Sequence, residues 1–138
     1  MAALEHSHSH DIMNRDLKPE NILLTETYAL KVADWGAACR ISECEKAKDL
    51  GTHGYMAPEY AKKFNKWPDE RKGFKYLPKS YGAKSEVWSV GSVLHEVLAL
   101  EPLFGSKKPS KAREWIYSNK PLPSLPKDVS TPTVELVG

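Results

Sequence analysis

The sequence predicts a mainly α-helical domain that also carries small β-hairpins, an α+β fold. The strongest helical signal runs from Lys84 to Leu100, where apolar side chains occur on nearly every side, as in a helix buried on all faces. Two short apolar runs, 22–24 and 28–33, are separated by polar residues, which is typical of a β-hairpin with its turn near 25–29. Prolines at 121, 123 and 126 favour an extended segment near the C-terminus.

The other expected elements are helical. Residues 2–10 and 109–118 have sequences compatible with helices, and shorter helical starts are expected at 57–59 and 130–137. The prediction is therefore a set of helices joined by loops, with strands confined to hairpins.

Composition excludes several classes of function. A chain of 138 residues with 41% hydrophobic and 28% charged residues has the make-up of one globular domain, which buries roughly two-thirds of its unfolded surface. The net charge of +2 is too small to imply a polyanionic partner. Polar residues interrupt the longest apolar stretch, 87–100, so we expect neither a membrane-spanning helix nor a signal peptide.

Polar side chains lie at the open end of the predicted hairpin. A turn at 25–29 pairs residues whose numbers sum to about 55, so Asn21 faces Asp34, with Cβ atoms ~5 Å apart. A carboxylate and an amide oxygen suit Mg²⁺, which takes its remaining ligands from water and phosphates. Asp16 and Lys18 precede the first strand, beside that cation. The pattern indicates a phosphate-handling site.

Four motifs in order resemble the signatures of eukaryotic Ser/Thr protein kinases. They are NRDLKPEN at 14–21, DWG at 34–36, GTHGYMAPE at 51–59 and KSEVWSVG at 84–91. The resemblance implies a kinase-like C-terminal lobe, mainly α with two small β-hairpins and truncated at both ends. Residues 1–138 would form a partial domain, from the end of the helix before the catalytic loop to the start of a helix after residue 130, with the N-terminal lobe absent.

The resemblance implies transfer of the ATP γ-phosphate to Ser or Thr of a protein substrate. Asp16 would accept the proton of the substrate hydroxyl, and Lys18 would neutralise the γ-phosphate during transfer. Thr52 would bond both of these side chains. Together, Lys18 and Thr52 point to Ser/Thr substrates rather than Tyr.

The same resemblance assigns the nucleotide and metal contacts. Asn21 and Asp34 would hold Mg²⁺ against the ATP phosphates. Three residues match positions that contact the ribose or adenine, namely Glu20, Leu23 and Ala33. ATP and Mg²⁺ are therefore the expected cofactors.

Three positions depart from the usual family residues. Asn14 stands where a His is usual, and Trp35 replaces Phe in the metal-binding triplet that ends at Gly36. Glu86, in place of Asp, would hold the backbone of the catalytic loop through amide N–H groups. We expect a repacked site around Asn14 and Trp35, with Glu86 as its anchor.

Residues 37–56 would form the activation segment. In the family, Arg15 pairs with a phosphorylated residue there, but the usual acceptor position holds Lys48. We expect that phosphorylation at this position does not switch the protein. Asp49 is the candidate constitutive partner of Arg15, and Ser42 is the alternative phosphorylation site.

The cysteines and histidines give no metal set. Cys39 and Cys44 fit neither a disulfide framework nor a zinc pattern, so ordinary free thiols are expected, with redox sensitivity as the less favoured alternative. This usage indicates a reducing compartment, cytoplasmic or alternatively nuclear. His6 and His10 share a helix face, but no carboxylate or Cys completes a zinc site.

A basic and aromatic insert occupies residues 62–79, with seven Lys/Arg and two Asp/Glu. Such interleaving can bind nucleic acid. Pro68, Gly73 and Pro78 interrupt any regular platform, however, so a surface insert near the substrate-docking face is favoured. The rival function is a non-catalytic, pseudokinase-like or truncated module that binds partners through this insert.

Parts of the kinase pattern are not found in these 138 residues. No Gly-rich loop or strand Lys precedes residue 14, so we expect the chain alone to have no useful activity, and an N-terminal lobe to be a partner in the full-length protein. We also expect Glu59 to lack its usual Arg partner, leaving a half-buried carboxylate alone.

Overall fold

The computed structural model describes residues 2–46, 51–59, 82–105, 109–118 and 121–127. Three α-helices lie wholly within these ranges, α1 (Ala2–Ser9), α3 (Ala83–Ala99) and α4 (Pro109–Tyr117), and Pro58 and Glu59 begin a further one, as expected. Four short strands form two antiparallel pairs: β1 (Ile12–Met13), β2 (Ile22–Leu24), β3 (Leu30–Val32) and β4 (Cys39–Arg40). Short 3₁₀ helices cover Pro19–Asn21, Ile41–Lys46 and His53–Tyr55. The α-helical content and small antiparallel sheets agree with the predicted fold class.

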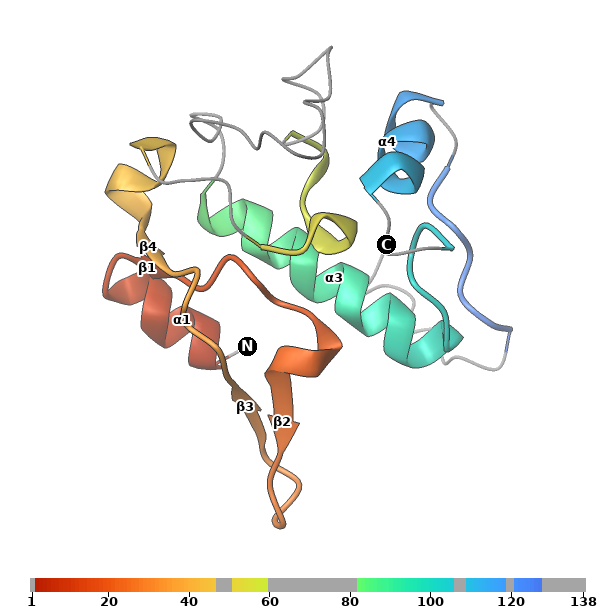
Figure 1. Cartoon of the computed structure of the whole chain (residues 1–138). Coiled ribbons are helices and arrows are strands. Elements are labelled where there is room, and N and C mark those ends of the chain that lie inside the picture. The colour runs from red at the N-terminus through yellow and green to blue at the C-terminus, as the bar shows by residue number, and fades with distance from the viewer. Residues whose placement is uncertain (1, 47–50, 60–81, 106–108, 119–120, 128–138) are drawn as a thin grey trace.

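Strands β2 and β3 form the predicted hairpin, which projects from the rest of the chain (Figure 1). Its turn lies where expected, because Tyr28 N donates to Thr25 O and Thr25 N donates to Ala29 O, both at 2.9 Å. Tyr28 adopts a left-handed conformation with φ of 59°. Apolar side chains on the hairpin are largely exposed, including Leu24 at 60% and Leu30 at 69%.

The predicted register of this hairpin is wrong by one residue. Leu24 pairs with Leu30 and Ile22 with Val32, and Ala33 N donates to Asn21 O at 2.8 Å. Asn21 therefore lies opposite Ala33, and Asp34 follows one residue beyond. The apolar pattern locates the turn only approximately. The five-residue turn at 25–29, with Tyr28 in the left-handed conformation, decides which residues face each other.

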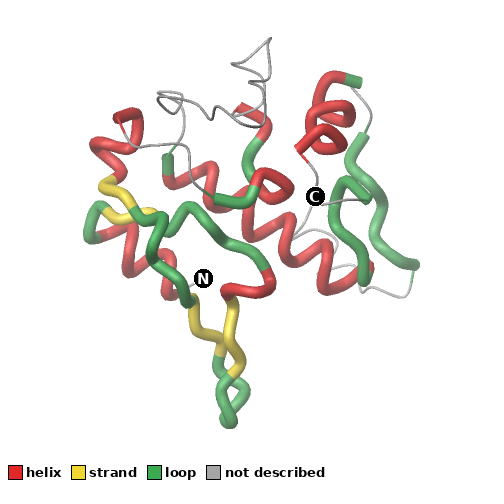
Figure 2. The backbone as a smooth tube through the Cα atoms, in the orientation of Figure 1, coloured by secondary structure: helices red, strands yellow, loops and turns green. Residues whose placement is uncertain are grey.

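The second strand pair is not a hairpin, contrary to the sequence prediction. β1 pairs with β4 in the register Ile12 to Arg40 and Met13 to Cys39, and the whole β2–β3 hairpin lies between them in sequence. Figure 2 shows the two pairs as separate yellow segments. This pairing fastens the chain after the DWG triplet to the strand that leads into residues 14–18, so it frames the candidate site.

Helix α3 starts and ends within one residue of its prediction, and Leu100 caps it in the left-handed conformation with φ of 56°. The expectation that every face is buried is wrong, since Val87 is 52% exposed and Val97 is 59% exposed. Its fully buried side chains are mostly polar, namely Ser85, Glu86, Ser89, Ser92 and His95, with Val93. Glu86, Ser85 and Ser89 form hydrogen bonds to other segments, whereas Ser92 Oγ and both ring nitrogens of His95 are buried without a hydrogen-bond partner among the described residues.

An apolar cluster packs against Trp88 of this helix. Leu103, Phe104 and Ala112 form this cluster, against which Trp88 and Trp115 pack. The rings of Phe104 and Trp115 have centroids 5.2 Å apart. Further core residues are Met13, Leu17 and Met56, all below 5% exposed. The helix expected at 109–118 is thus present, and its apolar face contributes to the apolar cluster.

Several sequence expectations lie outside the described residues. The insert at 62–79 and the helix after 130 fall there, as does the continuation of the helix expected from 57. Residues 121–126 form neither helix nor strand, in agreement with the proline pattern. Among the described residues, no helix is both long enough and apolar enough to span a membrane.

Candidate active site

A triangle of hydrogen bonds joins a catalytic-loop carboxylate to a lysine and a distant threonine. Lys18 Nζ donates to Asp16 Oδ2 at 2.7 Å and to Thr52 Oγ1 at 3.2 Å. Thr52 Oγ1 donates to Asp16 Oδ1 at 2.7 Å. The contacts expected of Thr52 are therefore present. They bring together residues from both sides of the β2–β3 hairpin.

The charge state of Asp16 follows from these partners. Partial burial raises the pKa of Asp16 and is the largest single effect. Hydrogen bonds from Lys18, Thr52 and Asn21, together with the charge of Lys18, outweigh it and leave the pKa below its ordinary value. Asp16 is therefore an anion at neutral pH, with lone pairs available to accept a further hydrogen bond.

Gly51 allows Thr52 to reach Asp16. Its φ is +113°, and a Cβ built there would lie 2.3 Å from Arg15 O and 3.0 Å from Met56 Cε. A side chain would push the Thr52 segment away from the backbone of the catalytic loop. The glycine thus permits the close approach of two chain segments on which the triangle depends.

We expect Gly51→Ala to destabilise the fold by about 3 kcal/mol, because the left-handed strain and the clash with backbone add together. Gly105→Ala is a matched control, since Gly105 has φ of +64° but no heavy atom within 4 Å of the added Cβ. The control isolates the strain and is expected to cost only about 1 kcal/mol. Urea unfolding of both variants measures the difference, and equal losses would contradict the proposed close approach.

Asn21 is bound to Asp16 rather than pointing freely into solvent. Its Nδ2 donates to Asp16 O at 2.9 Å and to Asp16 Oδ2 at 3.1 Å, and the residue is 7% exposed. Because the amide nitrogen of Asn21 points toward Asp16, the amide oxygen points to the opposite side of the carboxamide. That oxygen is the atom able to ligate a cation.

Asp34 follows the hairpin in a left-handed conformation, with φ of 53°. Its Oδ1 accepts a hydrogen bond from Gly36 N at 3.1 Å, and its main-chain oxygen accepts one from Asn14 Nδ2 at 2.9 Å. A Cβ at Gly36 would lie only 3.1 Å from Asp34 Oδ1, so glycine leaves room for this turn. The carboxylate is therefore held at the edge of the catalytic loop and is exposed to solvent.

The donor set fits Mg²⁺ supplied together with phosphates. The Asn21 amide oxygen and the Asp34 carboxylate are hard oxygen ligands of the kind that Mg²⁺ prefers. Among the described residues, no group of three or more His, Cys, Asp or Glu side chains could hold a metal ion. A cation bound by Asn21 and Asp34 would therefore complete its shell with water and nucleotide oxygens.

Asn14 links the two halves of the site. It is fully buried, its Nδ2 donates to Asp34 O, and its Oδ1 accepts a hydrogen bond from Asp16 N at 3.0 Å. A single carboxamide thus positions both the expected base and the expected metal ligand. The residue that stands in place of the usual His supplies a donor and an acceptor at this junction.

Glu86 of α3 anchors the catalytic loop from below. It is 1% exposed, and its Oε1 accepts a hydrogen bond from Arg15 N at 2.7 Å, as the resemblance implied. Its Oε2 lies 2.5 Å from His8 Nε2 on α1. Sequence reasoning missed His8, although its position on the same helix face as buried Leu4 and Ser7 was a usable signal.

Comparison with known proteins identifies the family. The model of the protein kinase domain matches residues 1–137. This chain belongs to the protein kinase domain family.

Individual relatives agree with that assignment. The human phosphorylase b kinase gamma catalytic chain, liver/testis isoform, is 34% identical over 109 residues, which are 78% of this chain and 25% of the relative. Serine/threonine-protein kinase cds1 of Schizosaccharomyces pombe is 33% identical over 143 residues, and the match covers 99% of this chain and 29% of the relative. PknB, a serine/threonine-protein kinase of Mycobacterium tuberculosis, is 34% identical over 126 residues, and the match covers 88% of this chain and 18% of the relative. The kinase chain thus spans less than a third of each of these relatives.

The residues expected to contact the nucleotide lie along the hairpin side of this kinase domain. Glu20 is exposed, Leu23 is 54% exposed and Ala33 is half-buried. The Trp35 indole is 39% exposed, and its Nε1 donates to Val32 O at 3.3 Å. The larger ring is thereby fixed to strand β3, and the roles of these residues toward ATP stay predictions.

Arg15 and Ser42 of the kinase occupy different surroundings. Arg15 is 5% exposed with φ of 68°, and its Nε donates to Ala37 O. Ser42 Oγ donates to Asp11 Oδ2 at 2.6 Å, and Ser42 N donates to Asp11 Oδ1 at 3.1 Å. A phosphate on Ser42 would therefore face a carboxylate. Asp49, the other candidate partner of Arg15, lies outside the described residues.

The expectation that Glu59 is left alone is wrong. Ser85 Oγ, at the first turn of α3, donates to Glu59 Oε1 at 2.5 Å. A hydroxyl from a neighbouring element can satisfy one carboxylate oxygen without an arginine, because it supplies a donor at close range. The sequence pattern could not indicate this contact, since 26 residues separate the two positions.

The expectation of free thiols is also wrong. Cys39 and Cys44 form a disulfide, with Cα atoms 5.7 Å apart. The 3₁₀ helix Ile41–Lys46 turns the chain back on itself and brings the two cysteines within bonding range. The cysteine spacing alone did not reveal that turn. The cysteine argument for a reducing compartment therefore loses its premise.

The histidine prediction concerned the exposed face of α1. His6 and His10 have ring centroids 4.4 Å apart, and His10 Nδ1 is 2.8 Å from His6 O. Both are exposed, in agreement with the helix-end interpretation. The part of the chain that the structure describes offers no third ligand for a metal beside them.

Proposed function

We propose that this chain is part of the C-terminal lobe of an ATP-dependent Ser/Thr protein kinase, spanning residues 1–138 of a longer catalytic domain. The parent reaction transfers the ATP γ-phosphate to a Ser or Thr hydroxyl of a protein substrate. The observation that carries the proposal is the bonded cluster of Asp16, Lys18, Asn21 and Thr52 at the motif positions of the matched family.

In this reaction Asp16 accepts the proton of the substrate hydroxyl at Oδ1 or Oδ2. Its lowered pKa keeps it ionised, so it orients the hydroxyl before transfer rather than removing the proton beforehand. Thr52 and Lys18 each bond one of its oxygens and fix the carboxylate plane. A positioned base of this kind supplies roughly a 10²–10⁴-fold rate enhancement.

Lys18 balances the negative charge of the transferring phosphoryl group. Its ammonium lies 2.7 Å from Asp16, so one cation serves both the base and the phosphate that approaches it. Mg²⁺, when bound with ATP, would neutralise charge on the phosphates, and the Asn21 amide oxygen and the Asp34 carboxylate would hold it. Asn14 keeps Asp34 close to Asp16, because it bonds the backbone of both, and Asn21 bonds Asp16 directly.

Substrate class follows from the loop sequence and the relatives. Lys18 and its bond to Thr52 favour Ser and Thr acceptors. The cds1 and PknB relatives are named serine/threonine-protein kinases, whereas HT1 of Arabidopsis thaliana, 33% identical over 124 residues, is named a serine/threonine/tyrosine-protein kinase. A cytoplasmic or nuclear location is part of the same proposal. The rival binding function rests on residues 62–79, outside the described residues, so no structural observation favours it.

The metal site is tested by NMR titration of the 138-residue chain with Mn²⁺, a paramagnetic substitute for Mg²⁺. We expect selective broadening of the Asn21 side-chain amide and of the Asp34 and Gly36 backbone amides, strengthened when ATP is added. Asp34→Asn should remove most of it, since the charged ligand is lost. Glu26→Gln, on the exposed hairpin turn, is the matched control. Broadening that spares Asn21, or that survives Asp34→Asn, would overturn the site.

Phosphoryl transfer is measured separately with Mg-ATP and Ser, Thr and Tyr peptides. The 138 residues contain no Gly-rich loop before residue 14, so we expect negligible transfer by this chain alone. Transfer that is abolished by Asp16→Asn would overturn the expected inactivity while supporting the role of Asp16. Transfer that persists in Asp16→Asn would contradict that role.

A further inference from the structure

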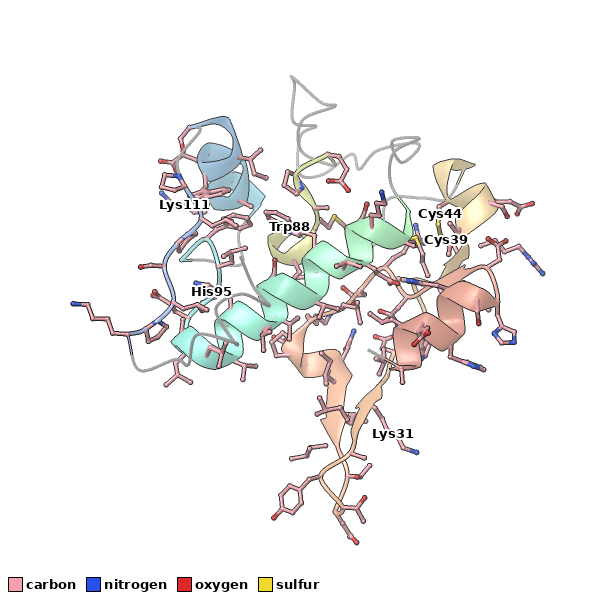
Figure 3. The ribbon with its side chains drawn as sticks, turned by 180° about the vertical axis from the view of Figure 1, so that it is seen from behind. Lys31, Cys39, Cys44, Trp88, His95 and Lys111 are labelled. Carbon is pink, nitrogen blue, oxygen red and sulfur yellow. A yellow bond between two sulfur atoms is a disulfide. The ribbon has the colours of Figure 1, made fainter. Side chains whose placement is uncertain are left out.

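The proposed reaction makes no use of the disulfide between Cys39 and Cys44. It closes a short loop at the start of the segment that follows the DWG triplet (Figure 3). Cys39 lies in β4, directly opposite Met13 of β1, and is partly exposed. Cys44 and Met13 are both 0% exposed. The bond thus joins a half-buried cysteine to one in the core.

The closed loop is fastened to the strand that leads into the catalytic loop. Ile41 N donates to Asp11 O at 2.9 Å, and Ser42 bonds the Asp11 carboxylate through both its backbone N–H and its hydroxyl. Both hydrogen-bonding residues lie between the cysteines. The disulfide therefore holds in place the residues that form hydrogen bonds to Asp11, and Asp11 lies three positions before Asn14.

The same segment also contacts the candidate site through a hydrogen bond between Ala37 and Arg15. Ala37, two residues before Cys39, accepts a hydrogen bond from Arg15 Nε through its main-chain oxygen. The neighbouring Arg15 N–H is bonded to Glu86, and Asp16 follows directly. A loosening of residues 37–44 would thus remove restraints on both sides of the catalytic loop.

We propose that Cys39 and Cys44 are a thiol–disulfide exchange site that controls the order of this segment, a regulation that rests on the proposed kinase function. Oxidised, the pair fastens residues 39–44 to β1; reduced by a cellular thiol or dithiol, it releases them.

The exchange has a preferred direction because Cys39 is a half-buried residue, whereas Cys44 is 0% exposed. A reductant thiolate attacks Cys39 Sγ, forms a mixed disulfide there and displaces Cys44 as a thiolate, which takes up a proton. A second reductant thiol then attacks the mixed disulfide, leaving two protein thiols and one oxidised reductant disulfide. Two electrons and two protons are transferred in all.

The reduced state has a place for its buried thiol. Cys44 Sγ lies 3.8 Å from Met13 Sδ. In the disulfide this is a van der Waals contact, because the sulfur carries no proton. After reduction the Cys44 S–H can donate weakly to the thioether, so the core accepts both redox states.

The test uses the 138-residue chain purified without reductant. Thiol titration in denaturant should find no free thiol, and two after treatment with dithiothreitol. Partial reduction with glutathione, followed by alkylation and mass spectrometry, should place the glutathione adduct on Cys39 at least about tenfold more often than on Cys44, because attack follows access. Two free thiols before reduction, or an adduct mainly on Cys44, would overturn the assignment.

Hydrogen exchange measures the control of order. Reduction should speed exchange of the Ile41 and Ser42 amides at least about tenfold, while the α4 amides are unchanged. A Cys39→Ala, Cys44→Ala double variant should exchange like the reduced chain and ignore dithiothreitol. If reduction left these amide exchange rates unchanged, the disulfide would be a cross-link that does not control order, and the proposed switch would be overturned. None of these readouts requires ATP or phosphoryl transfer, so failure of the proposed kinase function would appear separately, in the Mn²⁺ and peptide experiments.

Discussion

Asp16→Asn is expected to lower kcat by about 10²–10⁴-fold in any form of this kinase that transfers phosphate. The amide is nearly the same size as the carboxylate, but its nitrogen cannot accept a hydrogen bond, so the contacts from Lys18 Nζ and Thr52 Oγ1 cannot both be kept. It cannot take a proton from the substrate hydroxyl, and it no longer balances the lysine charge. Initial rates with a Ser/Thr peptide at saturating Mg-ATP measure the loss.

The control for this variant is Glu101→Gln, which removes an exposed carboxylate just beyond the end of α3. Its kcat should stay within about twofold of the unaltered protein, since exposed substitutions away from such features have small effects. An Asp16→Asn variant with an unchanged kcat and only a raised KM would show that Asp16 binds substrate without acting as its base.

Glu86→Ala is expected to destabilise the fold by about 3–5 kcal/mol, the largest effect on stability among the described residues that we consider. The substitution leaves the Arg15 N–H without its acceptor and His8 Nε2 without its partner, in a place where Glu86 is 1% exposed. Glu86→Gln should cost less, because its amide oxygen still accepts the Arg15 bond. Urea unfolding of the purified variants gives the free energies.

Two further variants decide what the Glu86 result means. Glu5→Ala removes an exposed carboxylate from α1 and should change stability by no more than about 0.5 kcal/mol. His8→Ala, measured alone and combined with Glu86→Ala, gives the coupling between the two side chains. A coupling near zero would show that the short His8–Glu86 contact adds nothing to the anchor, even if Glu86 itself is needed.

The stability and activity predictions share one structural cause. Glu86 holds the backbone of Arg15, and the adjoining Asn14 and Asp16 place the polar groups of the site. A weaker anchor should therefore affect catalysis as well as stability. The disulfide loop restrains the opposite side of the same segment through Asp11. Residues 11–16 are thus held by Glu86, a buried residue of α3, and by the loop between Cys39 and Cys44.

The sequence located the residues of the candidate site, and their roles toward substrate, phosphate and metal stay predictions. Asp16, Lys18, Asn21 and Asp34 stand at motif spacings that have few other uses, and their donor types suit a base, a phosphate cation and metal ligands. Local signals also located α3, α4 and the hairpin turn, because helical periodicity and turn residues act over a few positions. For the same reason the bounds of α3 were correct to within one residue.

Contacts between distant segments were decided only by the tertiary structure. The partners of His8, Glu59 and Ser42 lie 78, 26 and 31 positions away, and no local pattern specifies which hydroxyl or carboxylate arrives beside them. The hairpin register and the Cys39–Cys44 bond each depended on the path of a turn. A shift of one residue in a hairpin turn changes which residues are paired along both strands. Residue type and spacing therefore determined the family of this chain and the chemistry that we propose for it, whereas packing determined which groups restrain the candidate site, because burial selects among many possible partners by shape and distance.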